Sequence, residues 1–206
     1  MAKKSKKKSK PDSYYKILDA LEALIEEKNF SEIKWNDLAA KADVNAGLIY
    51  RYYKDLKNVL FVLFEKTTLD QVQEVQFGLR GIEGAFNKLR KFIWIQLHDT
   101  VAHRARGRMQ LLEARAHKSY FDSPAYEASR KYVSLLRGII EEGIETGEIR
   151  DDLPVNDIIR IILGAIEHTM MPALLFNLEA GSDNEIDRQA DTICKLLFPG
   201  LKKSPL

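Results

Sequence analysis

The residues of this chain best suited to chemistry are polar and lie close together, between positions 45 and 52. Asn45 and Arg51 carry amide and guanidinium groups of the kind that hydrogen-bond base edges and phosphates. Gly47 lets another backbone approach closely. At helical spacing, Ile49 and Tyr53 fall on the inward side of one short helix. Its outward side is expected to present Asn45, Ala46, Leu48, Arg51 and Tyr52. This pattern favours contact with a nucleic acid.

Patterns that would support catalysis or metal binding are missing from the sequence. The four histidines, at positions 98, 103, 117 and 168, form no His-x3-His or HExxH pair. The single cysteine, Cys194, excludes an internal disulfide and a cysteine-based zinc site. Adjacent carboxylates such as Glu141 and Glu142 diverge on a helix and indicate a solvated face. We therefore expect no enzyme, no metal site and no cofactor.

Composition indicates a globular protein. The chain has 206 residues, 45% of them hydrophobic and 30% charged, with a net charge of +2. The longest apolar stretch, from Ile158 to Ile166, is interrupted by Arg160 and is shorter than the roughly 20 residues of a membrane span. No apolar signal segment follows the basic N-terminus. The sequence therefore predicts a soluble, cytoplasmic protein without a membrane partner.

Six of the first ten residues are lysines. A run of like charges is disordered in isolation and often acts as an arm on an anionic polymer. Residues 1–10 are therefore expected to form a disordered lysine-rich tail. Whether this tail contacts DNA or is merely solvated is left open by the sequence.

The elements that must position these residues are helices. Apolar side chains recur at helical spacing along nearly the whole chain, as in Ile17, Leu18, Leu21, Leu24 and Ile25. The pattern predicts an all-α fold of about nine helices. Asp43-Val44-Asn45 separates two short helices, at about 35–42 and 46–52, and Asp55 is a plausible cap for a long helix after them.

Two short helices joined by a tight turn, after one longer helix, describe a three-helix helix-turn-helix. Val44 is the expected buried residue of the turn, and the small Ala39 and Ala42 allow the two helices to cross closely. The predicted organisation is a DNA-binding domain at 11–57 and a helical bundle at 58–206, to which the family resemblance described next assigns ligand binding and dimerisation. A linking helix at 58–80 joins them.

Residues 14–60 resemble the DNA-binding domain of the tetracycline-repressor (TetR) family of bacterial transcription regulators. The resemblance is carried by Ile17, Ala20-Leu21, Leu24-Ile25, Asn29-Phe30, Asp37-Leu38-Ala39, Ala42 to Tyr53, and Leu60. It implies a dimer on double-stranded DNA, with Tyr50 and Tyr52 near phosphates, Asn36 at a base-contacting position and Lys34 near the start of the first short helix. Trp35 is expected to pack beside Phe30 rather than against the DNA backbone.

The chain departs from the family pattern at several positions. Asp43 stands where the family usually has Gly, and Asn45 where it has Ser. Leu56 stands where a phosphate-contacting Lys is usual. Since a leucine cannot hold a phosphate, Lys54 and Lys57 are the expected substitutes.

The bundle is expected to bind a small apolar or amphipathic effector. A weaker resemblance, over Gln110–Arg115, Tyr132–Leu153 and Gly164–Glu167, is to family members that respond to fatty acyl-CoA. Candidate pocket residues follow from their bulk or amphipathic chemistry. They are Trp94, Leu97, His98, Met109, Leu112, Glu113, Tyr120, Phe121, His168 and Met171.

The predicted function is that of a dimeric, ligand-responsive repressor on a palindromic operator, because two DNA half-sites one turn apart require a dimer. Ile158–Ile166 and the segment 184–198 are the expected dimer interface. A ligand in the bundle would displace the linking helix and spoil the spacing of the two DNA-binding heads. The alternative is a nucleic-acid-binding dimer that acts through its basic tail without sequence preference. A helical protein adaptor is a third, which the helix-turn-helix argues against.

Overall fold

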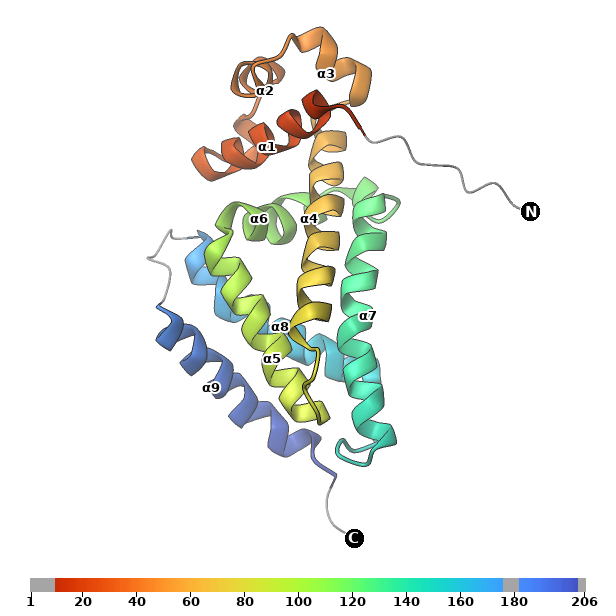
Figure 1. Ribbon diagram of the computed structural model, residues 1–206. Helices are drawn as coiled ribbons and strands as arrows, with labels where there is room; N and C mark the ends of the chain where they lie inside the picture. The colour runs from red at the N-terminus through yellow and green to blue at the C-terminus, as the bar shows by residue number, and fades with distance from the viewer. Residues whose placement is uncertain (1–9, 176–181, 204–206) are drawn as a thin grey trace, which may run out of the picture.

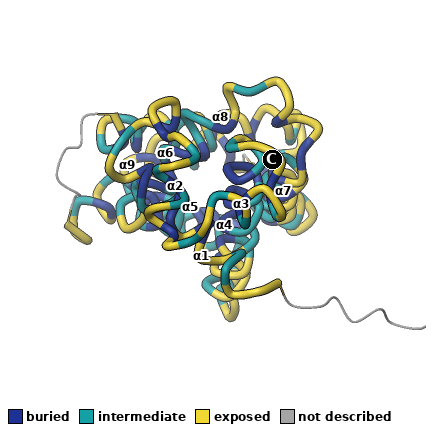
Figure 2. Tube along the Cα trace, turned by 90° about the horizontal axis from the view of Figure 1, so that it is seen from above, coloured by how far each residue is buried: buried dark blue, intermediate teal, exposed yellow. Residues whose placement is uncertain are grey.

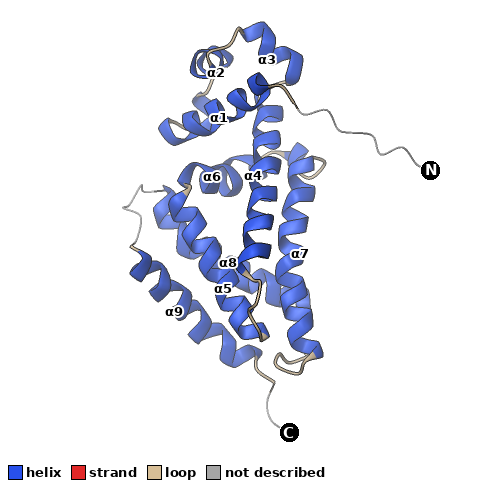
Figure 3. Cartoon of the chain, in the orientation of Figure 1, coloured by secondary structure: helices blue, strands red, loops and turns tan. Residues whose placement is uncertain are grey.

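The computed structural model describes residues 10–175 and 182–203, and in these residues it shows nine α-helices and no β-strand (Figures 1 and 3). The all-α prediction is confirmed. The helices are α1 (Asp12–Glu27), α2 (Trp35–Ala42), α3 (Ala46–Tyr52), α4 (Leu56–Gly78), α5 (Ala85–Ala102), α6 (Arg104–Arg108), α7 (Pro124–Glu145), α8 (Val155–Leu175) and α9 (Asp183–Leu201). A π-helical turn (Met109–Glu113) and short 3-10 turns connect α6 to α7.

Local side-chain chemistry sets the helix boundaries near the N-terminus. Asp43 ends α2 in the left-handed region, at φ 52°, which explains why the TetR pattern has glycine there. Asn45 caps α3, its Oδ1 accepting from Gly47 N at 2.7 Å. Asp55 caps α4, its Oδ1 accepting from Asn58 N at 2.7 Å. The predicted bounds 35–42 and 46–52 are confirmed, and the linking helix runs from Leu56 to Gly78 rather than from 58 to 80.

The head of the molecule comprises α1, α2 and α3, and α4 runs from it into the bundle formed by α5 to α9 (Figure 1). Figure 2 shows buried and exposed stretches along each helix, as expected for amphipathic helices. Burying one Leu or Ile side chain contributes about 1.5–3 kcal/mol, so each apolar stripe fixes its helix against its neighbours.

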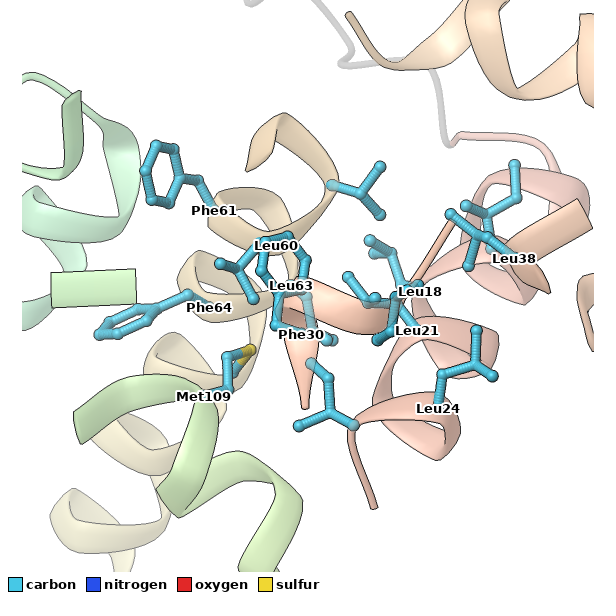
Figure 4. Packing of buried hydrophobic residues seen from close by; sticks show 14 of the residues in the cluster. Leu18, Leu21, Leu24, Phe30, Leu38, Leu60, Phe61, Leu63, Phe64 and Met109 are labelled. Carbon is cyan, nitrogen blue, oxygen red and sulfur yellow. The ribbon is translucent and has the colours of Figure 1, made fainter. Parts of the chain in front are cut away.

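Two clusters of buried apolar side chains form the core. The first joins α1 to α3 and the first half of α4 to residues after α5, among them Met109 and Tyr120. Figure 4 shows Phe30, Leu63, Phe64 and Met109 in this cluster. The second cluster joins the end of α4 to α5, α7, α8 and α9. The first core thus crosses the predicted domain boundary at 57/58, and the head is packed directly on part of the bundle.

One helix is more apolar than the sequence pattern predicted. Among the described residues, α8 is long and apolar enough to cross a membrane by length and composition, with a mean hydropathy of 1.5 over its best window. The window tolerates Arg160 and continues beyond Ile166, the end of the apolar stretch recognised in the sequence. One such helix is weak evidence for a membrane span, because the core helix of a soluble protein passes the same test, and 33% of this window is buried inside the described part of the chain.

Candidate nucleic-acid interface and internal cavity

The outer surface of α3 forms the end of the head (Figure 1). Asn45, Gly47, Tyr50 and Arg51 are exposed. Ala46, Leu48 and Tyr52 are half-buried. Ile49 and Tyr53, by contrast, are buried in the head core, as their spacing predicted. The short helix therefore presents one polar side to the surroundings and is held by the other.

Two tyrosines attach α3 to α1. The Tyr52 hydroxyl lies 3.0 Å from Ser13 Oγ, and its ring meets Tyr14 edge-on at 5.8 Å between centroids. Tyr53 Oη donates to the Tyr14 carbonyl at 3.0 Å, and burial raises the pKa of Tyr53. Tyr52 is therefore a positioning contact within the head, whatever else it touches.

Trp35 and Tyr50 lie against each other, with ring centroids 4.8 Å apart. Trp35 is half-buried against the head core, as expected of a packing residue, although its ring partner is Tyr50 rather than Phe30. Tyr50 remains 57% exposed. This contact joins the start of α2 to α3 and fixes the direction of the exposed ring.

Exposed cationic and amide groups flank α3: Lys34 and Asn36 at the start of α2, and Lys54 and Lys57 at the start of α4. Asp37 holds the start of α2, its Oδ2 accepting from Lys28 Nζ at 2.6 Å and from Lys34 N at 2.9 Å. These two hydrogen bonds, Lys28 first, hold the pKa of Asp37 below its ordinary value. All eleven predicted DNA-contacting residues therefore lie in α2, in α3 or in the residues that begin α2, α3 and α4.

A small cavity of about 60 Å³ lies in the bundle between α4, α5, the 109–113 turn, α7 and α8. Its lining combines apolar and uncharged polar side chains with one ion pair, Arg115 Nη1 to Glu167 Oε1 at 2.8 Å. That pair is half-exposed and lies on the side nearest solvent. The lining residues are Phe64, Thr68, Gln71, Gln96, Gln110, Leu111, Arg115, Ser129, Tyr132, Val133, Leu163 and Glu167.

The polar lining is ordered by hydrogen bonds. Gln110 Nε2 donates to Thr68 Oγ1 at 3.1 Å and to Gln71 Oε1 at 2.9 Å. Gln71 Nε2 in turn donates to Asp99. On the other side the Tyr132 hydroxyl donates to Gln96, and burial raises the pKa of Tyr132. These amides join three segments of the bundle around one small space.

A second hollow lies on the outside of the bundle, between α8 and α9. It is an apolar groove of about 290 Å³ lined by Leu153, Pro154, Asp157, Ile158, Ile161, Ile162, Leu196, Leu197, Gly200 and Leu201. Ile161 is 59% exposed and Leu196 76% exposed beside it. We call these exposed apolar side chains and the groove the α8/α9 face.

Two family models match the sequence. Residues 17–62 match the model described as bacterial regulatory proteins, tetR family, and residues 83–171 match the tetracyclin repressor-like C-terminal domain. Together they account for more than half of the chain, in the order and at the positions of the head and the bundle.

The chain belongs to the TetR family. Members of this family are transcriptional regulators that bind DNA, act as dimers and bind small ligands, and the chain is therefore a DNA-binding regulator and not an enzyme.

Among its relatives is the fatty acid metabolism regulator protein of Bacillus subtilis (strain 168), which is 26% identical over 94% of this chain and 98% of its own length. Two solved structures share the fold with a TM-score of 0.81. They are FadR from Bacillus subtilis in complex with stearoyl-CoA (24% identity, 91% of this chain and 99% of that one) and FadR from Bacillus halodurans (20% identity, 93% and 97%).

The departures from the TetR pattern have local explanations in the structure. Asn45 caps α3 as a serine would, because its Oδ1 accepts a hydrogen bond from Gly47 N. Leu56 is half-buried and packs against the head core. The phosphate-binding task is thereby left to the exposed neighbours Lys54 and Lys57, whose contact with DNA stays a prediction.

The structure does not gather the ten predicted pocket residues into one site, and none of them lines the internal cavity. Leu97 is buried in the second core, whereas Met109 and Tyr120 are buried in the first. Trp94 and His98 stack on each other at 4.8 Å. The other five are Leu112 and Met171, which are half-buried, Glu113, which accepts weakly from Phe30 N at 3.4 Å, and Phe121 and His168, which are exposed. Their part in ligand binding stays a prediction.

Three of the cavity residues that the sequence prediction did not select are amides, Gln71, Gln96 and Gln110. Gln71 and Gln96 stand on apolar stripes, at helical spacing from Phe64 and from Phe92 respectively. A polar residue on a buried stripe was the available signal, because such a group must find a hydrogen-bond partner inside the protein. Bulk and aromaticity, on which the prediction relied, mark core packing as readily as a pocket.

The lysine tail falls on residues 1–9, outside the described residues, apart from Lys10. Lys10 Nζ lies 4.9 Å from the centroid of the Tyr14 ring, near the first turn of α1.

Proposed function

We propose that this chain is a cytoplasmic repressor that binds a palindromic operator as a dimer and is released from it by a fatty acyl-CoA. The α3 surface around Arg51 and Tyr50 would read base edges in the major groove. Lys34, Lys54 and Lys57 would hold the phosphates on either side. The α8/α9 face would join two protomers, as the isologous interface of a two-fold dimer.

The observation that carries the ligand proposal is the internal cavity, because it touches α4, the helix that continues directly from the DNA-binding head. At about 60 Å³ it holds little more than water-sized groups. A long acyl chain can enter only a conformation in which the helices around the cavity have moved apart. Binding the ligand and displacing α4 would therefore be one event, as release from DNA requires.

Fatty acyl-CoA is favoured among amphipathic ligands by the relatives. The curated relative is a regulator of fatty acid metabolism, and one structural relative was solved with stearoyl-CoA. The cavity lining supports this proposal. Leu111, Val133 and Leu163 would offer apolar contacts, and the half-exposed Arg115 would bind a phosphate by exchanging its ion pair with Glu167.

The test starts from a duplex selected out of random sequences by the full-length protein. Its affinity is measured by fluorescence anisotropy with and without stearoyl-CoA, and with free CoA and stearate as controls. We expect stearoyl-CoA to weaken binding about 5- to 150-fold, the usual range of allosteric coupling, and the controls to have little effect. The effector proposal is wrong if acyl-CoAs from eight to eighteen carbons all leave operator affinity unchanged.

The same duplex tests the alternative in which the tail binds nucleic acid without sequence preference. Deleting residues 1–10 should leave most of the preference for the selected duplex over random DNA, even at raised salt. Loss of that preference together with the tail would favour the alternative.

A further inference from the structure

The contact between the head and the bundle contains a nearly buried charge. Arg106 lies on α6, which packs against α1 of the head and against α5 and α8 of the bundle. Its side chain is only 13% exposed. A charge removed from water in this way needs anionic partners, so the carboxylates that face it decide where α6 sits.

Arg106 has two such carboxylates, one on each side of the contact. Its Nη1 donates to Asp99 Oδ1, on α5, at 3.3 Å. Its Nε lies 3.9 Å from Glu22 Oε1, on α1, a distance that allows an ion pair but no hydrogen bond. This Nε is buried without a hydrogen-bond partner among the described residues. The guanidinium is therefore bonded to the bundle and only loosely paired with the head.

Asp99 connects Arg106 to the internal cavity. Its other oxygen, Oδ2, accepts from Gln71, and Gln71 accepts from Gln110 at 2.9 Å. Both glutamines line the cavity. His103 Nε2 also lies 3.8 Å from Asp99 Oδ1, at the half-exposed edge of the group. A continuous chain of polar contacts thus runs from the cavity through Asp99 and Arg106 to Glu22 in the head.

We propose that Arg106 is the positioning residue through which an occupied cavity acts on the DNA-binding head, an inference that rests on the proposed function. A ligand group that displaces Gln71, either directly or by taking the Gln110 hydrogen bond that orients it, removes a donor from Asp99. The carboxylate then draws the guanidinium further toward the bundle and away from Glu22. Because one guanidinium is paired with both acids, moving it toward Asp99 moves it away from Glu22. α6 and α1 then shift relative to each other, and α3 moves with α1 through Tyr52 and Tyr53.

The first test uses the full-length protein, the selected duplex and stearoyl-CoA. Glu22→Gln removes the anion of the head but leaves Arg106 paired with Asp99. Arg106→Lys keeps the charge but has a single head group that cannot serve both carboxylates. Both variants should bind the duplex within a few-fold of wild type. Their weakening by stearoyl-CoA should be at least about fivefold smaller than that of wild type.

The matched control is Glu26→Gln, an exposed carboxylate on the same helix, which should respond like wild type. Thermal melting followed by circular dichroism shows whether each variant is folded. A merely structural role of Arg106 would lower the melting temperature and leave the ratio of the two affinities unchanged. If folded Arg106→Lys and Glu22→Gln both respond fully to stearoyl-CoA, the proposal is overturned.

A second measurement needs no ligand. Gln110→Ala alters the cavity end of the chain of contacts and Glu22→Gln the head end, with no direct contact between them. The duplex affinity of the double variant should differ by more than about twofold from the value obtained by multiplying the two single-variant effects, because independent sites agree with that product to within about twofold. Multiplicative effects would overturn the proposal. A wild-type protein that selects no duplex would instead refute the proposed function, so the two failures are distinguishable.

Discussion

Leu196→Glu is the sharpest test of the α8/α9 face. Leu196 is 76% exposed in the protomer and lines the apolar groove between the two helices. Complete burial of a leucine is worth about 1.5–3 kcal/mol, so covering the exposed part contributes about 1–2 kcal/mol. A two-fold interface contains the residue twice, and the variant should lose about 2–4 kcal/mol of association free energy. At 1.4 kcal/mol per tenfold, the dimer dissociation constant should rise about 30- to 700-fold.

Sedimentation velocity over a concentration series measures that constant, and duplex affinity should fall with it because two half-sites must be bound together. Phe77→Glu is the matched control. Phe77 is equally apolar and 71% exposed, but it lies near the end of α4 and outside the groove. The reasoning is refuted if Leu196→Glu dimerises like wild type, or if Phe77→Glu dissociates to the same extent.

Three further predictions concern stability. A Cβ on Gly143 would lie 2.6 Å from both Ala85 Cβ and Ile149 Cδ1, so Gly143→Ala should lower the free energy of unfolding in urea by about 1–3 kcal/mol. A Cβ on Gly138 would meet nothing within 4 Å, so Gly138→Ala should raise that free energy by up to about 1 kcal/mol. Equal effects of the two substitutions would contradict the packing around Gly143. Asp43→Gly relieves the strain of a left-handed φ at this position and should raise the free energy of unfolding by up to about 1 kcal/mol. A lower free energy of unfolding would show that contacts of the Asp43 side chain contribute more than the strain costs. The folded protein lowers the pKa of Asp37, so the Asp37 carboxylate stabilises the fold above its ordinary pKa of 3.8, and this stabilisation is lost as pH falls through the pKa of the folded state. The urea midpoints of wild type and Asp37→Asn should therefore differ at pH 6 and converge at lower pH. A difference that widens on acidification would show that folding raises the pKa of Asp37 instead.

Much of the head could be predicted because its signals are local. The two short helices, their capping residues and the inward direction of Ile49 and Tyr53 all follow from spacing within a few residues. The direct contact between head and bundle could not, because Met109 and Tyr120 reach the head core from positions about fifty residues or more along the chain. Periodicity marks these side chains as apolar but does not say which core they enter.

The internal cavity shows the same limit. Gln71, Gln96 and Gln110 surround one cavity although they come from α4, α5 and the turn after α6. Each could be recognised in the sequence only as a polar residue in an apolar setting. Residues chosen for bulk, such as Leu97, proved to be fully packed core, because large apolar side chains fill space more often than they enclose it.

The sequence by itself determined the helices and the helix-turn-helix, since these depend on interactions between residues that are near neighbours in the chain, and its resemblance to the TetR family gave the class of regulator. Only the tertiary structure decided that Arg106 lies between Asp99 and Glu22, that α8 and α9 leave an apolar groove uncovered, and where the cavity is. Those features depend on how helices cross, and crossing is set by the summed packing of many side chains, which no local pattern encodes.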